Sequence, residues 1–144
     1  MVQGEFWVDI GRGGQMNLTK HPLTELEQRL IDVAAGQGYE LTHLTKYVGE
    51  LGDPRSHVTI YLDRERVIRQ VIKVMIHPET PAEKLEAIEA GQGLSLSPDL
   101  SHNSNLRRFP KRLNNGKAEI GFARSVVCAD ITAFDRLLHT LAAE

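Results

Sequence analysis

The sequence has a single cysteine and no long apolar run. A lone thiol, Cys128, cannot close an intramolecular disulfide, and the chain lacks the ~18 consecutive apolar residues that a membrane span requires. No charged start followed by a long apolar stretch marks a secretion signal. We therefore expect a soluble protein of the reducing cytoplasm, in which Cys128 is a small core residue.

The sequence also lacks the common signatures of catalysis. Its six histidines show neither the i, i+4 helical pairing nor the cysteine partners of a zinc site. The run Gly-Arg-Gly-Gly at 11–14 has no strand before it and no helix after it, so it does not match a phosphate-binding loop. Asp63 with Glu65, and Asp99, are the local candidates for magnesium ligands, but charged strand ends occur in most domains. We predict no catalytic residue, no metal site and no cofactor, which favours a protein that is not an enzyme.

The length and composition of the sequence are those of one globular domain. The chain has 144 residues, of which 41% are hydrophobic and 25% charged, enough to build a single core. Residues 1–15 show no periodicity and contain Gly11, Gly13 and Gly14. We expect residues 1–15 to be a flexible N-terminal extension or to precede a true start at Met16, with an edge strand around Trp7 as the alternative. We expect a single domain over residues 16–144.

Periodicity and capping residues predict an α+β fold. A capping box at Thr24 and Glu27, a Thr80-Pro81 start and Asp130 as N-cap predict helices at 24–35, 81–90 and 131–142. Alternating apolar residues predict strands at 39–48, 56–63, 69–78 and 118–128, and residues 91–117 form an irregular connection. The predicted order is α-β-β-β-α-loop-β-α. It implies a mostly antiparallel sheet of about four strands, packed on one face by two or three helices. The predicted core is Leu26, Leu30, Ile60, Leu62, Ile72, Val74, Phe134 and Leu138.

One stretch resembles a known family. The residues GYELTHLTKYVGELGDPRSHVTIYLD, preceded by the capped helix, resemble the amino-terminal half of the ribosome maturation factor RimP. In that family a helix leads into a Gly-Tyr-Glu-Leu strand, and a second strand ends in Asp. The resemblance covers about residues 24–63, and the sequence after Asp63 departs from the family. No function is carried over from it.

Charge is distributed unevenly along the chain. Residues 102–124 contain six basic residues and one acid, Glu119, whereas the rest of the chain contains eleven basic and eighteen acidic residues. Such an asymmetry favours long-range attraction to a negatively charged partner. The basic residues lie in and just after the irregular connection, whose basic loop spans residues 102–117.

The residue types of this segment match those that bind phosphates. Arginine binds phosphate oxygens through two parallel N–H donors, and lysine contributes a positive charge. Asparagine contributes neutral hydrogen-bond donors, and a phenylalanine ring can stack on an unpaired base. We predict that the basic side chains at 107–117 converge on one exposed face. The candidate anion-binding residues are Asn105, Arg107, Arg108, Phe109, Lys111, Arg112, Lys117 and Arg124, and Phe122 offers a second ring.

Three interpretations of this segment stay open at this point. The first, which we favour, is a small non-enzymatic domain that binds RNA or DNA through residues 102–124. The second is a protein-binding accessory factor, regulator or immunity-type inhibitor that uses the same arginines against an acidic protein surface. The third is a structural loop, in which the arginines pair with acids of the same chain while Leu106, Phe109 and Leu113 attach it to the core.

Overall fold

The fold was analysed in a computed structural model, which describes residues 7–9, 15–17, 21–114 and 118–143. Strands β1 (Trp7–Asp9) and β2 (Gln15–Asn17) pair with each other as a separate two-stranded antiparallel sheet. The other residues of the predicted extension at 1–15 lie outside the described part. Whether that segment is a flexible extension therefore stays a prediction.

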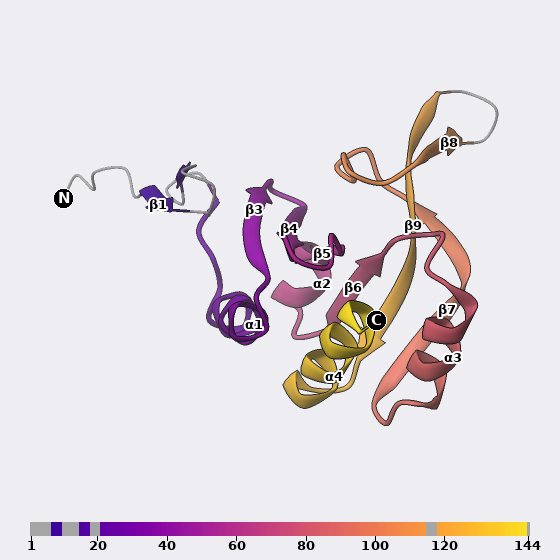
Figure 1. Cartoon of the computed structure of the whole chain (residues 1–144). Helices are drawn as coiled ribbons and strands as arrows, with labels where there is room; N and C mark the ends of the chain where they lie inside the picture. Colours follow the sequence, from indigo (N-terminus) through magenta and orange to yellow (C-terminus); the bar gives the residue numbers. More distant parts are fainter. Residues whose placement is uncertain (1–6, 10–14, 18–20, 115–117, 144) are drawn as a thin grey trace.

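A seven-stranded antiparallel sheet forms the body of the protein (Figure 1). Strand β8 pairs only with β9, beyond the point where β9 leaves the rest of the sheet. In spatial order the strands are β3 (Glu40–Leu44), β4 (Val48–Gly52), β5 (Thr59–Asp63), β6 (Ile72–Ile76), β9 (Glu119–Cys128) and β7 (Leu94–His102), with β8 (Lys111–Leu113) at the far end of β9.

Four helices lie within the described residues and accompany the sheet, and the three predicted ones are confirmed. They are α1 (Glu25–Gly36), α3 (Ala82–Ala90) and α4 (Ile131–Ala142), joined by the short α2 (Arg64–Ile68). The Thr24–Glu27 capping box starts α1, and the Asp130 side chain accepts a hydrogen bond from the Ala133 amide at the start of α4. Thr80 does not cap α3: the N-cap is Pro81, without a side-chain cap, and the Thr80 hydroxyl donates to the carbonyl of His77. None of the described helices is long and apolar enough to cross a membrane.

The main core lies between the helices and one face of the sheet. It contains Leu30 of α1, Ile88 of α3 and Phe134 of α4, which pack against Ile60 of β5 and Val74 of β6. All eight predicted core residues belong to this cluster, with Leu26 partly buried at its edge. Cys128 is also buried there, as expected, and burial raises the pKa of its thiol to about 12. Alternation along the strands thus correctly identified the helix-covered face.

The strand prediction was wrong in number and order. The segment predicted as one strand at 39–48 contains β3 and the turn that leads into β4, in which the Thr45 hydroxyl accepts a hydrogen bond from the Val48 amide. The second strand of this hairpin, β4, continues to Gly52. The connection predicted as irregular contains β7 and β8. Pro98 interrupts the apolar pattern of β7, where the pairing with β9 shifts between Leu96 and Leu100. An edge strand tolerates proline at such a bulge, which is why the pattern was missed.

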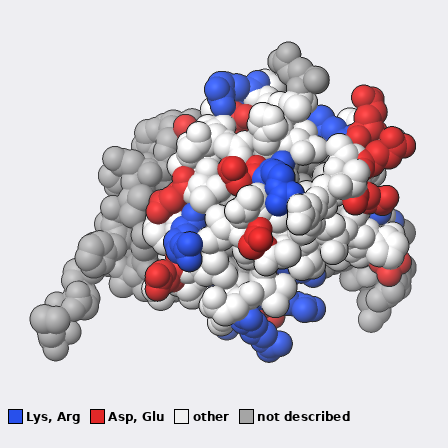
Figure 2. Space-filling view, turned by 90° about the horizontal axis from the view of Figure 1, so that it is seen from below, with Lys and Arg blue, Asp and Glu red and all other residues white. Residues whose placement is uncertain are grey.

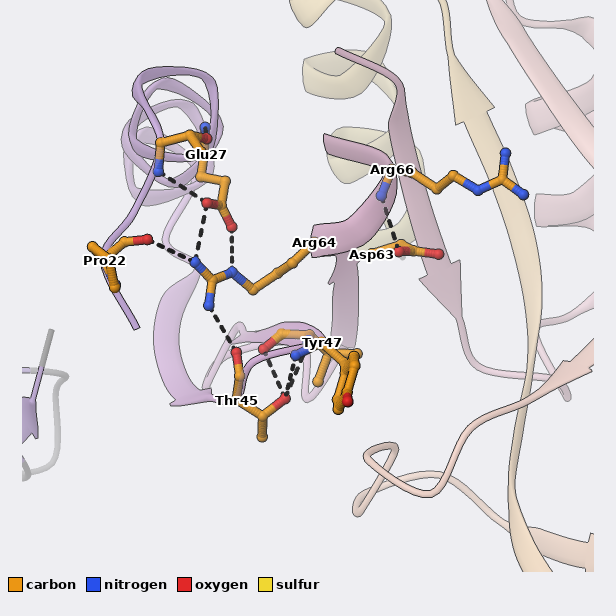
Figure 3. A network of polar contacts seen from close by, with 9 residues as sticks. Pro22, Glu27, Thr45, Tyr47, Asp63, Arg64 and Arg66 are labelled. Atoms are coloured by element: carbon orange, nitrogen blue, oxygen red, sulfur yellow. Dashed lines mark hydrogen bonds and ion pairs between the residues drawn. The ribbon is translucent and has the colours of Figure 1, made fainter. Parts of the chain in front are cut away.

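A buried ion pair ties the first helix to the β3–β4 hairpin (Figure 3). Arg64, the first residue of α2, reaches the carboxylate of Glu27 with Nε at 2.5 Å and Nη2 at 3.2 Å. Its other donors reach the carbonyls of Thr45 at 2.8 Å and Pro22 at 2.9 Å. Both charged side chains are almost fully buried, so each depends on the other for its polar contacts.

We expect Arg64→Met to destabilise the protein by about 3 kcal/mol, because it leaves the Glu27 carboxylate buried without its partner. Arg66→Met is the matched control, since Arg66 is exposed on the same helix, and it should change stability by less than about 0.5 kcal/mol. Urea denaturation of both variants measures the difference. Equal midpoints for the two variants would contradict the assignment.

Candidate functional site

The connection between β7 and β8 packs across the sheet face opposite the helices. Leu106 and Phe109 are buried there in a second apolar cluster with Val48, Tyr61, Met75 and Ala123. The Phe109 ring meets the edge of the Tyr61 ring at a centroid distance of 4.9 Å and that of His77 at 5.3 Å. Phe109 is only 5% exposed, so this ring is part of the packing.

Gly121 of β9 permits this close approach. A side-chain Cβ at this position would lie 2.8 Å from the carbonyl oxygen of Leu106, so only glycine leaves room for the connection. The Asn103 amide donates to the Gly121 carbonyl at 2.9 Å, and the Phe122 amide donates to the Pro110 carbonyl at 3.1 Å. The connection is therefore attached to β9 by backbone contacts on both sides of its bend.

A fully buried carboxylate, Glu50 of β4, receives the first two arginines of the basic segment. Arg107 donates to it through Nε at 3.0 Å and Nη2 at 2.9 Å, a two-pronged contact, and Arg108 Nε adds a third bond at 3.2 Å. The hydroxyl of Thr42 donates at 2.6 Å and that of Tyr61 at 2.7 Å. Both arginine side chains are still nearly half exposed, so the group keeps one net positive charge at the surface.

The environment of Glu50 shifts several pKa values. Burial alone would raise the pKa of the Glu50 carboxyl, but hydrogen bonds from Arg107, Thr42 and Tyr61 lower it to about 2. Burial and the neighbouring carboxylate raise the pKa of Tyr61, whose oxygen also accepts a bond from the Arg108 amide. Burial and the positive charge of Arg107 lower the pKa of His43, which pairs with Glu50 across the two strands.

Lys111 and Arg112 lie on a two-stranded arm formed by β8 and the first three residues of β9, which rises above the sheet in Figure 1. The Arg112 guanidinium lies 4.7 Å from the centre of the Phe122 ring, and its Nε donates to Nε2 of His102 at 2.8 Å. The imidazole of His102 lies 6.2 Å from the Phe122 ring on the same side of the strands. These contacts hold the Arg112 guanidinium over an aromatic ring.

Arg124 follows Phe122 by two residues, so both side chains point to the same side of β9. Its Nη1 donates to the carbonyls of Ser97 at 3.2 Å and Pro98 at 3.5 Å, at the bulge of β7. Its Nε is buried and has no partner among the described residues. We call the surface formed by His102, Arg112, Phe122 and Arg124 the Arg112 face.

The predicted single face is thus divided between two sides of the sheet. Arg107, Arg108 and Phe109 lie on the side of Glu50, and Arg112 with Arg124 lies on the other. Lys111 and Leu113, on alternate positions of β8, point away from the Arg112 face, and Glu119 pairs with Leu113 there. The backbone amide and the side-chain amide of Asn105 both donate hydrogen bonds to the side-chain oxygen of Asn103. Lys117 lies outside the described residues.

Several residues of the site were not singled out by sequence reasoning, above all Glu50, Thr42, Tyr61 and His102. Glu50 precedes Arg107 by more than fifty residues, and an acid in a strand usually faces water, so no local pattern marks it. The one interpretation of the sequence that allows for such a contact is the structural loop, in which the arginines pair with acids of the same chain. It applies to Arg107 and Arg108, whereas Lys111 and Arg112 have no carboxylate partner within the described part of the chain.

Comparisons with protein-family models, with curated proteins and with solved structures found no match for this chain. Among the described residues, no group of three histidine, cysteine or acidic side chains is placed to hold a metal ion.

The stability of the protein should fall in acid because of Glu50. A carboxyl whose pKa is lowered from 4.5 to about 2 stabilises the fold above its ordinary pKa, and this contribution disappears as the pH falls through about 2. The shift corresponds to about 3 kcal/mol. We expect Glu50→Gln to remove this part of the pH dependence and to weaken the attachment of the basic connection.

Urea unfolding between pH 7 and pH 2 measures the effect. Glu86→Gln serves as the matched control, because Glu86 is exposed on α3 and should leave the pH dependence unchanged. If wild type and Glu50→Gln lose stability in parallel as the pH falls, the role assigned to Glu50 is wrong.

Proposed function

We propose that the protein is a non-enzymatic domain that binds single-stranded RNA or DNA through the segment 102–124, with the Arg112 face as the contact surface. The observation that carries this proposal is the exposed Arg112 guanidinium, which lies over the Phe122 ring beside His102 and has no carboxylate partner among the described residues. Unpaired bases stack on aromatic rings and guanidinium planes, and arginine binds phosphate with paired donors.

The arrangement of charge supports the same conclusion. Arg112 and Arg124 lie on either side of Phe122 on one surface, so phosphates of a strand crossing β9 can meet a cation on each side of a stacked base. The underside of the molecule, where α1 and α4 lie in Figure 1, carries acidic and basic side chains interspersed (Figure 2). Acidic side chains gather at the right-hand edge of this view, and the basic side chains of the described residues stand apart from one another (Figure 2).

A protein partner is the second candidate, favoured by one observation on the opposite side of the arm. Leu113 is 59% exposed on β8, next to Lys111, and β8 pairs with only one strand among the described residues. An edge strand with an exposed apolar side chain can accept a strand from a partner. The two sides of the arm therefore separate the two candidate functions.

Arg112→Ala should weaken binding of a fluorescent single-stranded oligonucleotide about tenfold, because it removes both a stacking surface and a phosphate contact. The plot of log affinity against log salt should flatten by roughly 0.7 for the lost contact. Fluorescence anisotropy at several salt concentrations measures both changes.

Lys111→Ala is the matched control, since it removes the same charge from the adjacent residue on the opposite side of β8. It should change affinity by less than about threefold through long-range charge alone. Equal losses for the two variants would rule out the Arg112 face as the contact surface. Absence of oligonucleotide binding by the wild type at low salt would move the assignment to a protein partner.

A further inference from the structure

A cavity of about 370 Å³ lies beside the basic connection, outside the Arg112 face. It opens between the start of β5, the end of β6, the start of α3 and the end of α4. Its volume is in the range of small-molecule sites, about 300–1,000 Å³. The residues used below are His57, Ile76, His77, Lys84, Arg108, Phe109 and Leu141.

The inner wall of the cavity is apolar. Phe109, Ile76 and Leu141 line it, and each of these side chains is at least nine-tenths buried. The T-shaped contact between the rings of Phe109 and His77 fixes the position of both rings in the wall. A flat apolar group of a ligand would bury its surface against this wall.

The rim of the cavity is cationic. Lys84 Nζ donates to the carbonyl of Leu141, which holds the ammonium against the rim and leaves two of its hydrogens free. Arg108 uses Nε for Glu50, and its two terminal nitrogens have no acceptor among the described residues. Glu79, an exposed residue, is the only carboxylate among the described residues that line the cavity.

His77 adds a neutral donor. Its Nδ1 accepts a hydrogen bond from the Glu79 amide at 3.0 Å, so the proton of the neutral ring resides on Nε2. His57, on the rim, has a φ of 64°, a left-handed conformation that is uncommon outside glycine. The His57 amide donates to the Asp53 carbonyl at 2.8 Å, which fixes this turn, and residues in such conformations concentrate at ligand sites.

We propose that this cavity binds a small organic phosphate. Its phosphate group lies between Arg108, Lys84 and His77, and its apolar part lies against Phe109. Two cationic side chains and an imidazole N–H that line the same cavity match a dianionic phosphate in charge and in hydrogen-bond donors. Because Lys84 and His77 lie outside the basic segment, the inference stands apart from nucleic-acid binding, and variants of either residue test it separately.

Phenyl phosphate is a suitable probe, since it combines a flat ring with a phosphate dianion. We expect it to shift the NMR signals of His77, Lys84 and Phe109, with a dissociation constant in about the millimolar range for so small a molecule. Inorganic phosphate and benzyl alcohol, which each carry only one of the two features, should bind at least about fivefold more weakly. The inference would be overturned if inorganic phosphate or benzyl alcohol bound as tightly as phenyl phosphate. It would also be overturned if the shifts were confined to the Arg112 face or if no signal shifted.

Two variants test the individual contacts. Lys84→Met keeps the length of the side chain without its charge, and His77→Phe keeps the ring without its donor. Each should weaken phenyl phosphate binding about tenfold. Lys46→Met, at an exposed turn between β3 and β4, is the control and should bind like the wild type.

Thermal melting identifies a variant that fails to fold, and the other variant then carries the test. Undiminished binding by a folded Lys84→Met or His77→Phe protein would overturn the assignment. The Arg112→Ala protein should retain phenyl phosphate binding in full, and a loss there would place the probe on the Arg112 face.

Discussion

The carboxylate of Glu50 lies in the middle of a sheet face that carries no helix, and it stays ionised there because five hydrogen bonds reach its two oxygens. Two of the donors are hydroxyls of neighbouring strands, and three belong to arginines that come from the far end of the chain. Water cannot replace them at a fully buried group. The long connection is held over the second face because its arginines are the cationic partners, among the described residues, of that charge.

This constraint explains why a region rich in Gly, Ser, Pro and Asn is nevertheless ordered against the sheet. The apolar anchors Leu106 and Phe109 bury surface, but they do not by themselves select one position of the chain. The paired donors of Arg107 fix the direction of the connection, and the Tyr61 hydroxyl fixes the backbone at Arg108. Once the connection is fixed, its continuation into β8 and the wall of the neighbouring cavity are fixed as well.

The sequence predicted the parts of the fold that local chemistry decides. Capping residues and apolar periodicity gave α1, α3 and α4 within a residue or two, because helix signals lie within a few positions of one another. The alternation in β5 and β6 identified the face beneath the helices. The same alternation placed Tyr61 and Met75 on the other face, but nothing local indicated that this face was covered too. The cover comes from residues more than thirty positions away.

The candidate site was likewise predictable only in the part that local sequence decides. Composition drew attention to the segment 102–124, but it could not show which side each cation faces. The period of two along β8 and β9 determines this, and β8 was not predicted. Lys111 and Arg112 are neighbours in sequence and face opposite ways for this reason. Phe122 was noted as a second ring. Its arginine partner could be assigned only from the register that pairs Arg112 with Ile120.

Strand β9 belongs to both the body and the arm. Its second half pairs with β6 and β7 in the interior of the sheet, and its first half pairs with β8 (Figure 1). No hinge separates the two halves, because the strand is continuous from Glu119 to Cys128 and the connection is bonded to it at Gly121. The arm is therefore mechanically an extension of a central strand. A load applied to it passes directly into the hydrogen-bonded interior of the sheet, and its direction follows the twist of that sheet.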